Sequence, residues 1–181
     1  MHGFRRRFGR VTATLEPLEA TLIADLVDQV RELLAGRRQD APEDPLATLT
    51  GMAVGSAAKP EDPALARLLP DFHADDPALS SGLRQLREPD LIAGKDAAAV
   101  TLLDTLPRGG GTVRLDEDQT TAWMTALNDV RLAMSERLGI VADDAEPAEV
   151  LADPDGPAAA MYATYRWLSA VLDSLVTAAM D

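Results

Sequence analysis

The two histidines are the first place to look for catalytic or metal-binding chemistry, because imidazole is a frequent general base and metal ligand. His73 lies in the acidic stretch DFHADD at positions 71–76, and an imidazole beside carboxylates has the donor types that bind a divalent cation. The other histidine, His2, is far away in the sequence, so no second imidazole stands near His73. We therefore interpret this stretch as a solvated acidic turn with Phe72 anchored in the core, and we predict no metal site.

The glycine run Gly109–Gly111 and the serines are the remaining candidates for enzyme chemistry. A phosphate-binding loop follows a strand and precedes a helix, whereas here a predicted helix precedes the glycines and a predicted strand follows them. No serine lies in a GxSxG motif. Most carboxylate pairs fall in loops or first helical turns, where capping and solvation account for them. We therefore expect no enzyme and no cofactor.

A basic run of Arg5, Arg6 and Arg7 stands out in a chain whose formal net charge is −13. Phe4 and Phe8 flank this run, and arginine beside phenylalanine can neutralise and stack on a nucleic acid. The run could equally protect an edge strand by its charge, or dock onto an acidic surface. The overall negative charge opposes approach to phosphate backbones and favours the last two interpretations. We predict no direct contact with nucleic acid.

A second set of polar residues lies inside apolar helical stretches. It consists of Asp129, Arg131 and Arg166, next to Trp123 and Trp167. Ion pairs that hold two helices together are the first interpretation of these charges. An interaction surface is the second, because tryptophan and arginine are enriched among the residues that anchor interfaces.

Length and composition limit the class of protein. A chain of 181 residues, 46% of them hydrophobic, is long enough for one domain, which we place at residues 1–181. The absence of cysteine excludes disulfides and thiolate nucleophiles and agrees with a reducing cytoplasm. No apolar run approaches the roughly 20 residues that cross a bilayer. We expect a cytoplasmic protein without a targeting signal and without membrane contact.

The stretch from 109 to 140 gives the clearest structural signal. Residues 112–115 alternate as a short strand, and Asp116 with Gln119 forms a capping box for the helix that follows. Gly139 then ends the helix. Apolar residues recur along one face of this helix, at Trp123, Leu127, Val130, Met134 and Leu138, and predict that it is central to the core.

A similar pattern occurs 100 residues earlier. Glu16 and Glu19 stand where Asp116 and Gln119 stand, and Ile23 matches Trp123. This likeness suggests two strand-then-helix units. We predict that the strands near Phe8–Thr14 and Thr112–Leu115 pair, since two lone strands would leave backbone groups without partners.

The remaining elements complete a mainly α fold of about four long helices, several short ones and a minor two-stranded β element. A basic, strand-forming start covers residues 1–15, and the long helical regions are 16–36, 77–106, 116–139 and 157–180. In the first helix we expect a buried stripe of Leu18, Leu22, Leu26, Val30 and Leu33, ended by Gly36. Pro89 predicts a break within 77–106, because proline disfavours a helical residue before it. Short helical pieces are expected at 46–51, 64–69 and 146–151.

Five blocks, in matching order over nearly the whole chain, resemble an actinobacterial family of unknown function whose genes lie beside that of the proteolytic adaptor ClpS. They are ALARLLPDF at 64–72, LREPDLI at 86–92, LLDTLP at 102–107, WMTALNDVRL at 123–132 and YRWL at 165–168. None of them is a catalytic motif. One branch of that family is described as actinomycete oxidative-stress regulators, which implies a small cytoplasmic protein with a regulatory role.

The resemblance implies that the protein acts on transcription through a partner, such as a sigma factor or another transcription component. The neighbouring gene offers an alternative, an accessory role in ClpS-linked proteolysis. A small-molecule or metal-binding enzyme is the rival from another class. We favour a non-enzymatic regulator that works by protein–protein contact, with a homodimer plausible. Because the chain has no cysteine, we predict that it does not sense oxidants by disulfide chemistry.

Overall fold

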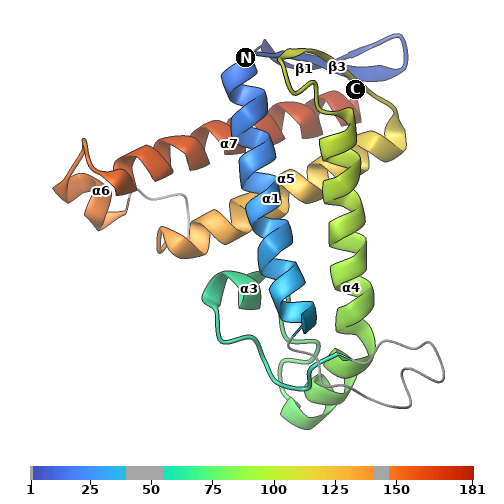
Figure 1. The fold of residues 1–181 in the computed structure, drawn as a ribbon, viewed down its shortest axis with the longest axis vertical. Helices are drawn as coiled ribbons and strands as arrows, with labels where there is room; N and C mark the ends of the chain where they lie inside the picture. Colours follow the sequence, from blue (N-terminus) through green and yellow to red (C-terminus); the bar gives the residue numbers. More distant parts are fainter. Residues whose placement is uncertain (1, 40–54, 141–146) are drawn as a thin grey trace.

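The protein is mainly helical, as predicted, with a small antiparallel sheet at one end (Figure 1). The computed structural model describes residues 2–39, 55–140 and 147–181. Helices α1 and α4 run side by side, and α5 and α7 cross behind them. The helices are α1 (Pro17–Gln39), α3 (Pro63–Leu68), α4 (Pro77–Thr105), α5 (Glu117–Arg137), α6 (Ala148–Ala152) and α7 (Pro157–Met180).

The sheet has the strand order β1-β2-β3, with strands β1 (His2–Arg7), β2 (Arg10–Leu15) and β3 (Gly111–Leu115). The predicted pairing of the two sequence-distant strands is confirmed, because Ala13 of β2 lies opposite Val113 of β3. The prediction of only two strands is wrong. Phe8 and Gly9 have φ angles of 51° and 74°, so the chain turns within two residues and β1 pairs with β2 as a hairpin.

The predicted capping box at the start of α5 is present. The Asp116 carboxylate accepts the backbone N–H of Gln119 at 2.9 Å, and the Gln119 side chain accepts the N–H of Asp116 at 3.0 Å. At the start of α1, the Glu19 carboxylate accepts the N–H of Glu16 at 2.8 Å. The two strand-then-helix units thus share their capping position, their strands pair, and their helices are in contact.

The core lies between the helices and the inner face of the sheet. Trp123 is fully buried, and its ring meets that of Phe4 edge-on at 5.8 Å between centroids. The predicted apolar stripe of α5 is buried from Trp123 to Met134. The predicted stripe of α1 is wrong except at Val30, since Leu18 is 83% exposed and the buried apolar side chains are Ala20, Ile23, Val27, Val30 and Leu34. These buried positions match those of α5 at an offset of 100 residues, with Ile23 equivalent to Trp123.

Helix α4 runs without a break through Pro89, which corrects the predicted interruption. Proline has no N–H to donate to the carbonyl of Gln85, four residues earlier. The N–H of Gly55 donates to that carbonyl instead, at 2.8 Å. A side chain at position 55 would crowd the proline ring, because a Cβ there would lie 3.1 Å from Pro89 Cδ. Helix α1 likewise continues past Gly36, the predicted stop, to Gln39.

The short helices follow local signals. Helix α3 lies where a helix over 64–69 was predicted, and the carboxylate of its N-cap residue Asp62 accepts the N–H of Leu65 at 2.8 Å. Helix α6 overlaps the short helix predicted at 146–151. The piece predicted at 46–51 lies outside the described residues. Within the part of the chain that the structure describes, no helix has the length and apolar character needed to span a membrane.

Candidate interaction surface

One face of the sheet is apolar and buried, and the other is rich in arginine and threonine. Alternation along the strands produces this division, because successive side chains point to opposite faces. The inner face consists of Phe4, Val11, Ala13, Leu15, Val113 and Leu115, all buried. The outer face, which we name the arginine face, consists of Arg5, Arg7, Arg10, Thr12, Thr14, Thr112 and Arg114.

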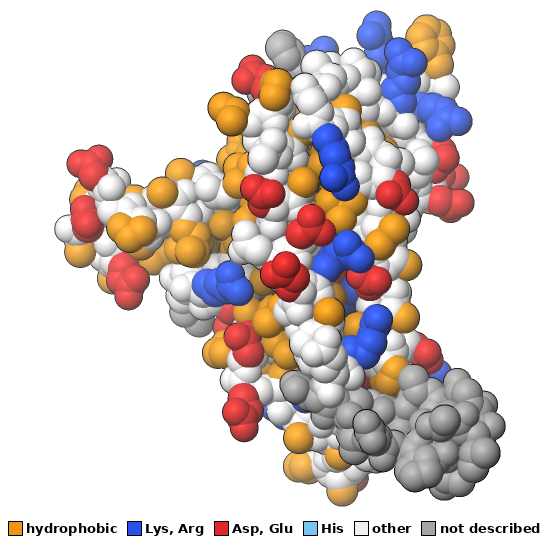
Figure 2. Space-filling view, in the orientation of Figure 1, with side chains coloured by type: hydrophobic (Ala, Val, Ile, Leu, Met, Phe, Trp, Pro, Cys, Tyr) orange, Lys and Arg blue, Asp and Glu red, His pale blue; other side chains and the backbone are white. Residues whose placement is uncertain are grey.

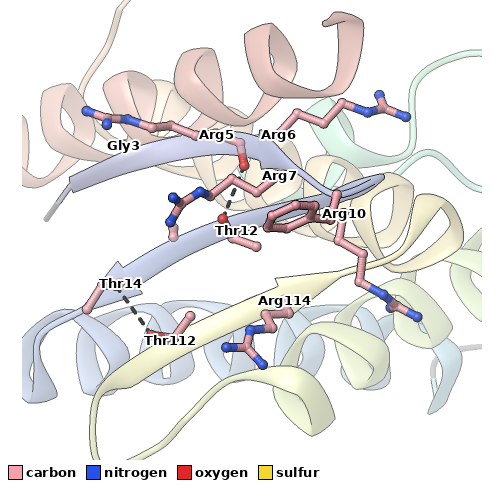
Figure 3. A pocket seen from close by; sticks show the side chains of 11 residues that line it. Gly3, Arg5, Arg6, Arg7, Arg10, Thr12, Thr14, Thr112 and Arg114 are labelled. Carbon is pink, nitrogen blue, oxygen red and sulfur yellow. Dashed lines mark hydrogen bonds between the residues drawn. The ribbon is translucent and has the colours of Figure 1, made fainter.

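The register aligns the arginine face in rows across the strands. Arg5, Thr12 and Arg114 are directly opposite one another on β1, β2 and β3. In the next row the hydroxyls of Thr14 and Thr112 lie 3.5 Å apart. Figure 3 shows how these side chains lie around a shallow hollow of about 940 Å³ that they line. The surface is open, as a protein contact requires, rather than an enclosed cavity.

The charge on this face is largely uncompensated. Arg10 lies 3.7 Å from the carboxylate of Asp116. The side chains of Arg5, Arg7 and Arg114 form no ion pair or hydrogen bond with any residue that the structure describes. Figure 2 shows Lys and Arg side chains gathered at the end of the molecule where the β1–β2 hairpin turns. Neighbouring guanidinium groups repel one another, so this face favours an anionic partner.

Arg6 has a different role from its two neighbours. It is the residue opposite Val11, on the inner side of the sheet, and its Nη1 donates to the carbonyl of Ala179 at 3.1 Å. That carbonyl belongs to the last turn of α7, where a cation stabilises the helix dipole. The basic run therefore divides into two arginines on the arginine face and one that ties β1 to α7.

Phe8 occupies the tip of the hairpin and is fully exposed. Its φ of 51° is in the left-handed region, which costs a residue with a side chain on the order of 1 kcal/mol. Phe4, the other aromatic residue beside the arginines, is 5% exposed and belongs to the core. Of the two phenylalanines, only Phe8 is placed to contact a partner.

The polar residues of the apolar helices do not join the arginine face. Trp123 is buried, and its Nε1 donates to Thr105 Oγ1 at 2.7 Å. Asp129 is also buried and binds Lys95 of α4 at 2.6 Å, which is an ion pair between two helices. Burial raises the pKa of Asp129, and the bond from Lys95 opposes this shift.

The other three members of that set lie on α5 and α7. Nη2 of Arg131 donates to Asn128 at 3.3 Å, one turn earlier on the same helix. Arg166 is exposed on α7, and the neighbouring Trp167 is half-buried against the core. Since Trp123 and Asp129 are buried, these five residues do not share one exposed surface with Arg5–Arg7.

Sequence reasoning missed a buried cluster of charges near the start of α4, far from the sheet. Glu88 accepts from Arg37 Nε at 2.7 Å and from Arg84 Nη1 at 2.8 Å, and all three side chains are buried. Arg84 also donates to Asp71 at 2.7 Å, and the hydrogen bond from Lys59 to Asp71 lowers the pKa of that carboxyl. The i,i+4 spacing of Arg84 and Glu88 was a signal, but Arg37 is 51 residues from its partner.

The candidate metal and phosphate motifs have structural roles. His73 Nδ1 accepts the backbone N–H groups of Asp75 and Asp76 at 3.3 and 3.0 Å, within an exposed turn. The described ranges contain no group of three or more His, Cys, Asp or Glu side chains that could hold a metal ion. In the glycine run, Gly110 has a φ of 77° and packs so closely on Pro17 that a Cβ would lie 2.7 Å from the proline nitrogen.

Comparison with known proteins places the chain in a family. The model of the domain of unknown function DUF2017 matches residues 1–179. Proteins of Mycobacterium tuberculosis and Mycobacterium bovis, each named oxidative stress regulator AosR, are 37% identical to the chain over 184 residues, covering 94% of this chain and 83% of each relative. No solved structure matches it significantly. The chain belongs to the DUF2017 family.

Proposed function

We propose that this protein is a non-enzymatic regulator in an oxidative-stress response, and that it acts by binding a protein partner through the arginine face. The shared name of the mycobacterial relatives supports the regulatory part of this proposal. The observation that carries the contact is the group of three exposed arginines, Arg5, Arg7 and Arg114, with no ion-pair partner among the described residues. We place the protein in the cytoplasm, as a regulator of this kind requires.

The partner surface is acidic in this proposal. Guanidinium groups bind carboxylates with two parallel hydrogen bonds, so a face with several free arginines is well suited to a cluster of aspartates and glutamates. A nucleic acid is the less favourable anion. Its backbone continues beyond the arginine face, where its phosphates are repelled by the rest of this protein, whose net charge is −13. A cluster of carboxylates on a protein can be confined to the arginine face.

The oxidative signal reaches this protein through its partner. Thiolates provide the fast and reversible oxidation steps, and this chain has none. Binding to a partner whose cysteines have been replaced should therefore be the same with and without diamide. A reversible, diamide-dependent change under those conditions would show that the chain senses oxidants itself.

Capture of the tagged protein from cells of its source tests the contact. The test variant replaces Arg5, Arg7 and Arg114 with glutamate. The matched control replaces three other exposed arginines with glutamate, which are Arg38 on α1, Arg87 on α4 and Arg137 on α5. Both variants change the net charge equally, and thermal melting confirms that both are folded. We expect the wild type and the control to capture the same partner protein in equal amounts. The test variant should capture about tenfold less of it.

Mass spectrometry of the captured protein distinguishes the expected partners. A sigma factor or other transcription component would support the regulatory function, and ClpS-linked machinery would support the alternative of accessory proteolysis. Recovery of a second copy of this chain would show a homodimer through this face. A partner recovered equally by all three forms would contradict the assignment of the arginine face, and a turnover reaction by the purified protein would contradict its non-enzymatic nature.

A further inference from the structure

The tip of the β1–β2 hairpin combines two unfavourable features in one residue. Phe8 exposes its whole side chain to solvent, and its φ of 51° is one that glycine or asparagine adopts more easily. Its ring has no aromatic or cation–π contact within the described part of the chain. Strain and exposure of this kind, when they persist at a surface, point to a functional contact.

Phe8 also lies at the border of the arginine face. It lines the same hollow as Arg5, Arg7 and Arg10. Phenylalanine and arginine are both enriched at protein interfaces, and arginine is one of the residues that most often dominate the binding energy. The hairpin therefore presents one apolar group at the end of a row of positive charges.

We infer that Phe8 is an aromatic anchor, and that the arginine face binds an extended acidic segment of the partner that carries an apolar side chain next to its carboxylates. This inference rests on the proposed function and adds the chemistry of the partner segment. Arg5 and Arg7 are two residues apart on a strand, a distance of about 6.6 Å, which alternate residues of an extended segment also span. Carboxylates at alternate positions can therefore reach both arginines, and an apolar residue that follows them along the segment lies toward Phe8, which comes directly after Arg7.

Synthetic peptides with a fluorescent label provide a direct probe. The first peptide has three glutamates that alternate with serine, followed by leucine at the next alternate position. The second has serine in place of that leucine, the third has the three glutamates next to one another, and the fourth has glutamine in place of glutamate. A single-stranded oligonucleotide of similar length serves as the competing class of anion. Fluorescence anisotropy at low salt measures each affinity.

Two variants separate the anchor from the fold. Phe8→Asn removes the ring and places at the turn a residue that favours positive φ, so its melting temperature should equal or exceed that of the wild type. Leu151→Asn removes a different exposed apolar side chain, on α6, which lies on the opposite side of the molecule in Figure 1. It should leave every peptide affinity unchanged.

We expect the leucine peptide to bind the wild type most tightly. Phe8→Asn should weaken it about tenfold, to the affinity of the serine peptide, and should leave the serine peptide unaffected. Adjacent glutamates should bind more weakly than alternating ones, and glutamine should abolish binding. Equal effects of Phe8→Asn on the leucine and serine peptides would overturn the inference. So would tighter binding of the oligonucleotide that also depends on Phe8. If no acidic peptide binds while capture in cells still depends on Arg5, Arg7 and Arg114, this inference fails and the proposed function stands.

Discussion

The arginines at the two ends of α4 differ in burial and in pairing. Where α4 begins, Arg37 and Arg84 are 7% and 1% exposed, and each guanidinium has a Glu88 oxygen within 2.8 Å. Where α4 ends, beside the sheet, Arg5, Arg7 and Arg114 are exposed and have no carboxylate partner in the described part of the chain. The side chain is the same, but its surroundings are opposite.

This difference separates a structural role from a binding role. A buried charge without a partner is costly, and the guanidinium groups of Arg37 and Arg84 both bind Glu88, so their interactions are used within the fold. An exposed arginine retains its hydration and can exchange water for a partner carboxylate. We therefore expect substitutions in the buried cluster to change stability, and substitutions on the arginine face to change binding.

Replacement of Glu88 with alanine should have the largest effect on stability in this comparison. It leaves two buried guanidinium groups without their shared carboxylate and should lower the free energy of unfolding by about 3–5 kcal/mol. Glu32→Ala, at an exposed position on α1, is the control and should cost less than about 0.5 kcal/mol. Urea denaturation measures both. Similar small values for the two variants would mean that the buried cluster does not support the fold.

The aromatic residues provide a parallel test of the same distinction. Trp123→Ala should cost about 3–5 kcal/mol, because the ring is buried against Phe4 and its Nε1 binds Thr105. Phe8→Asn should cost nothing or stabilise the protein. Thermal melts compare the two variants directly. A melting temperature of Trp123→Ala within a few degrees of the wild type would contradict the assignment of Trp123 to the core.

The Lys95–Asp129 pair should make stability depend on pH. Burial raises the pKa of Asp129, so the folded state holds this proton to higher pH than the unfolded state, and the contribution of Asp129 falls as pH rises above about 4. Lys95→Met removes the counterion and raises the pKa further. It should therefore destabilise the protein more at about pH 7, where the lone carboxylate is charged, than at about pH 4, by on the order of 1–3 kcal/mol. Urea denaturation at the two pH values measures both losses of unfolding free energy. A larger loss at about pH 4 than at about pH 7 would contradict this prediction.

Single alanine substitutions across the basic run should give the smallest effects. Arg6→Ala removes the bond to the Ala179 carbonyl at the end of α7 and should cost about 0.5–1 kcal/mol. Arg5→Ala and Arg7→Ala should each stay within about 0.5 kcal/mol of the wild type. The variant in which Arg5, Arg6 and Arg7 are all alanine should remain folded, and its loss of unfolding free energy should equal that of Arg6→Ala alone. Equal losses at all three positions would mean that Arg5 and Arg7 also support the fold.

Local patterns predicted a large part of the fold. The capping box at Asp116 and the alternation of residues 112–115 identified the strand and helix around which the core forms. The likeness between the two halves predicted that β2 and β3 pair. It also matched Ile23 with Trp123, which are both buried, but the buried stripe of α1 was predicted from the leucine spacing and was wrong except at Val30. The capping box and the alternation succeed because each depends on residues close together in the sequence, and the pairing succeeds because two lone strands need partners for their backbone groups.

The features that were missed depend on residues far apart or on an unusual turn. Strand β1 was missed because Phe8-Gly9 lacks the Asn-Gly or Asp-Gly pair that usually marks a two-residue hairpin. The continuity of α4 through Pro89 depends on the N–H of Gly55, 30 residues earlier than the carbonyl of Gln85 that it satisfies. Strand alternation separates Arg6 from Arg5 and Arg7, but the three were treated as one run because β1 was not recognised as a strand of its own. The arginine run was recognised as a candidate site, but Arg10 and Arg114, the arginines of the arginine face on β2 and β3, were not.

The most direct test of the account is the affinity of the captured partner for variants that lose the arginines one at a time. Isothermal titration measures how tightly the purified partner binds each form. The series consists of the wild type, Arg114→Ala, the double variant Arg5→Ala/Arg114→Ala, and the variant in which Arg5, Arg7 and Arg114 are all alanine. We predict that the affinity falls by roughly two- to fivefold with each arginine removed, and that added salt weakens the wild type most. The unfolding free energy should stay within about 0.5 kcal/mol throughout. An affinity that stays constant across the series would contradict the claim that the arginine face is where this protein binds its partner.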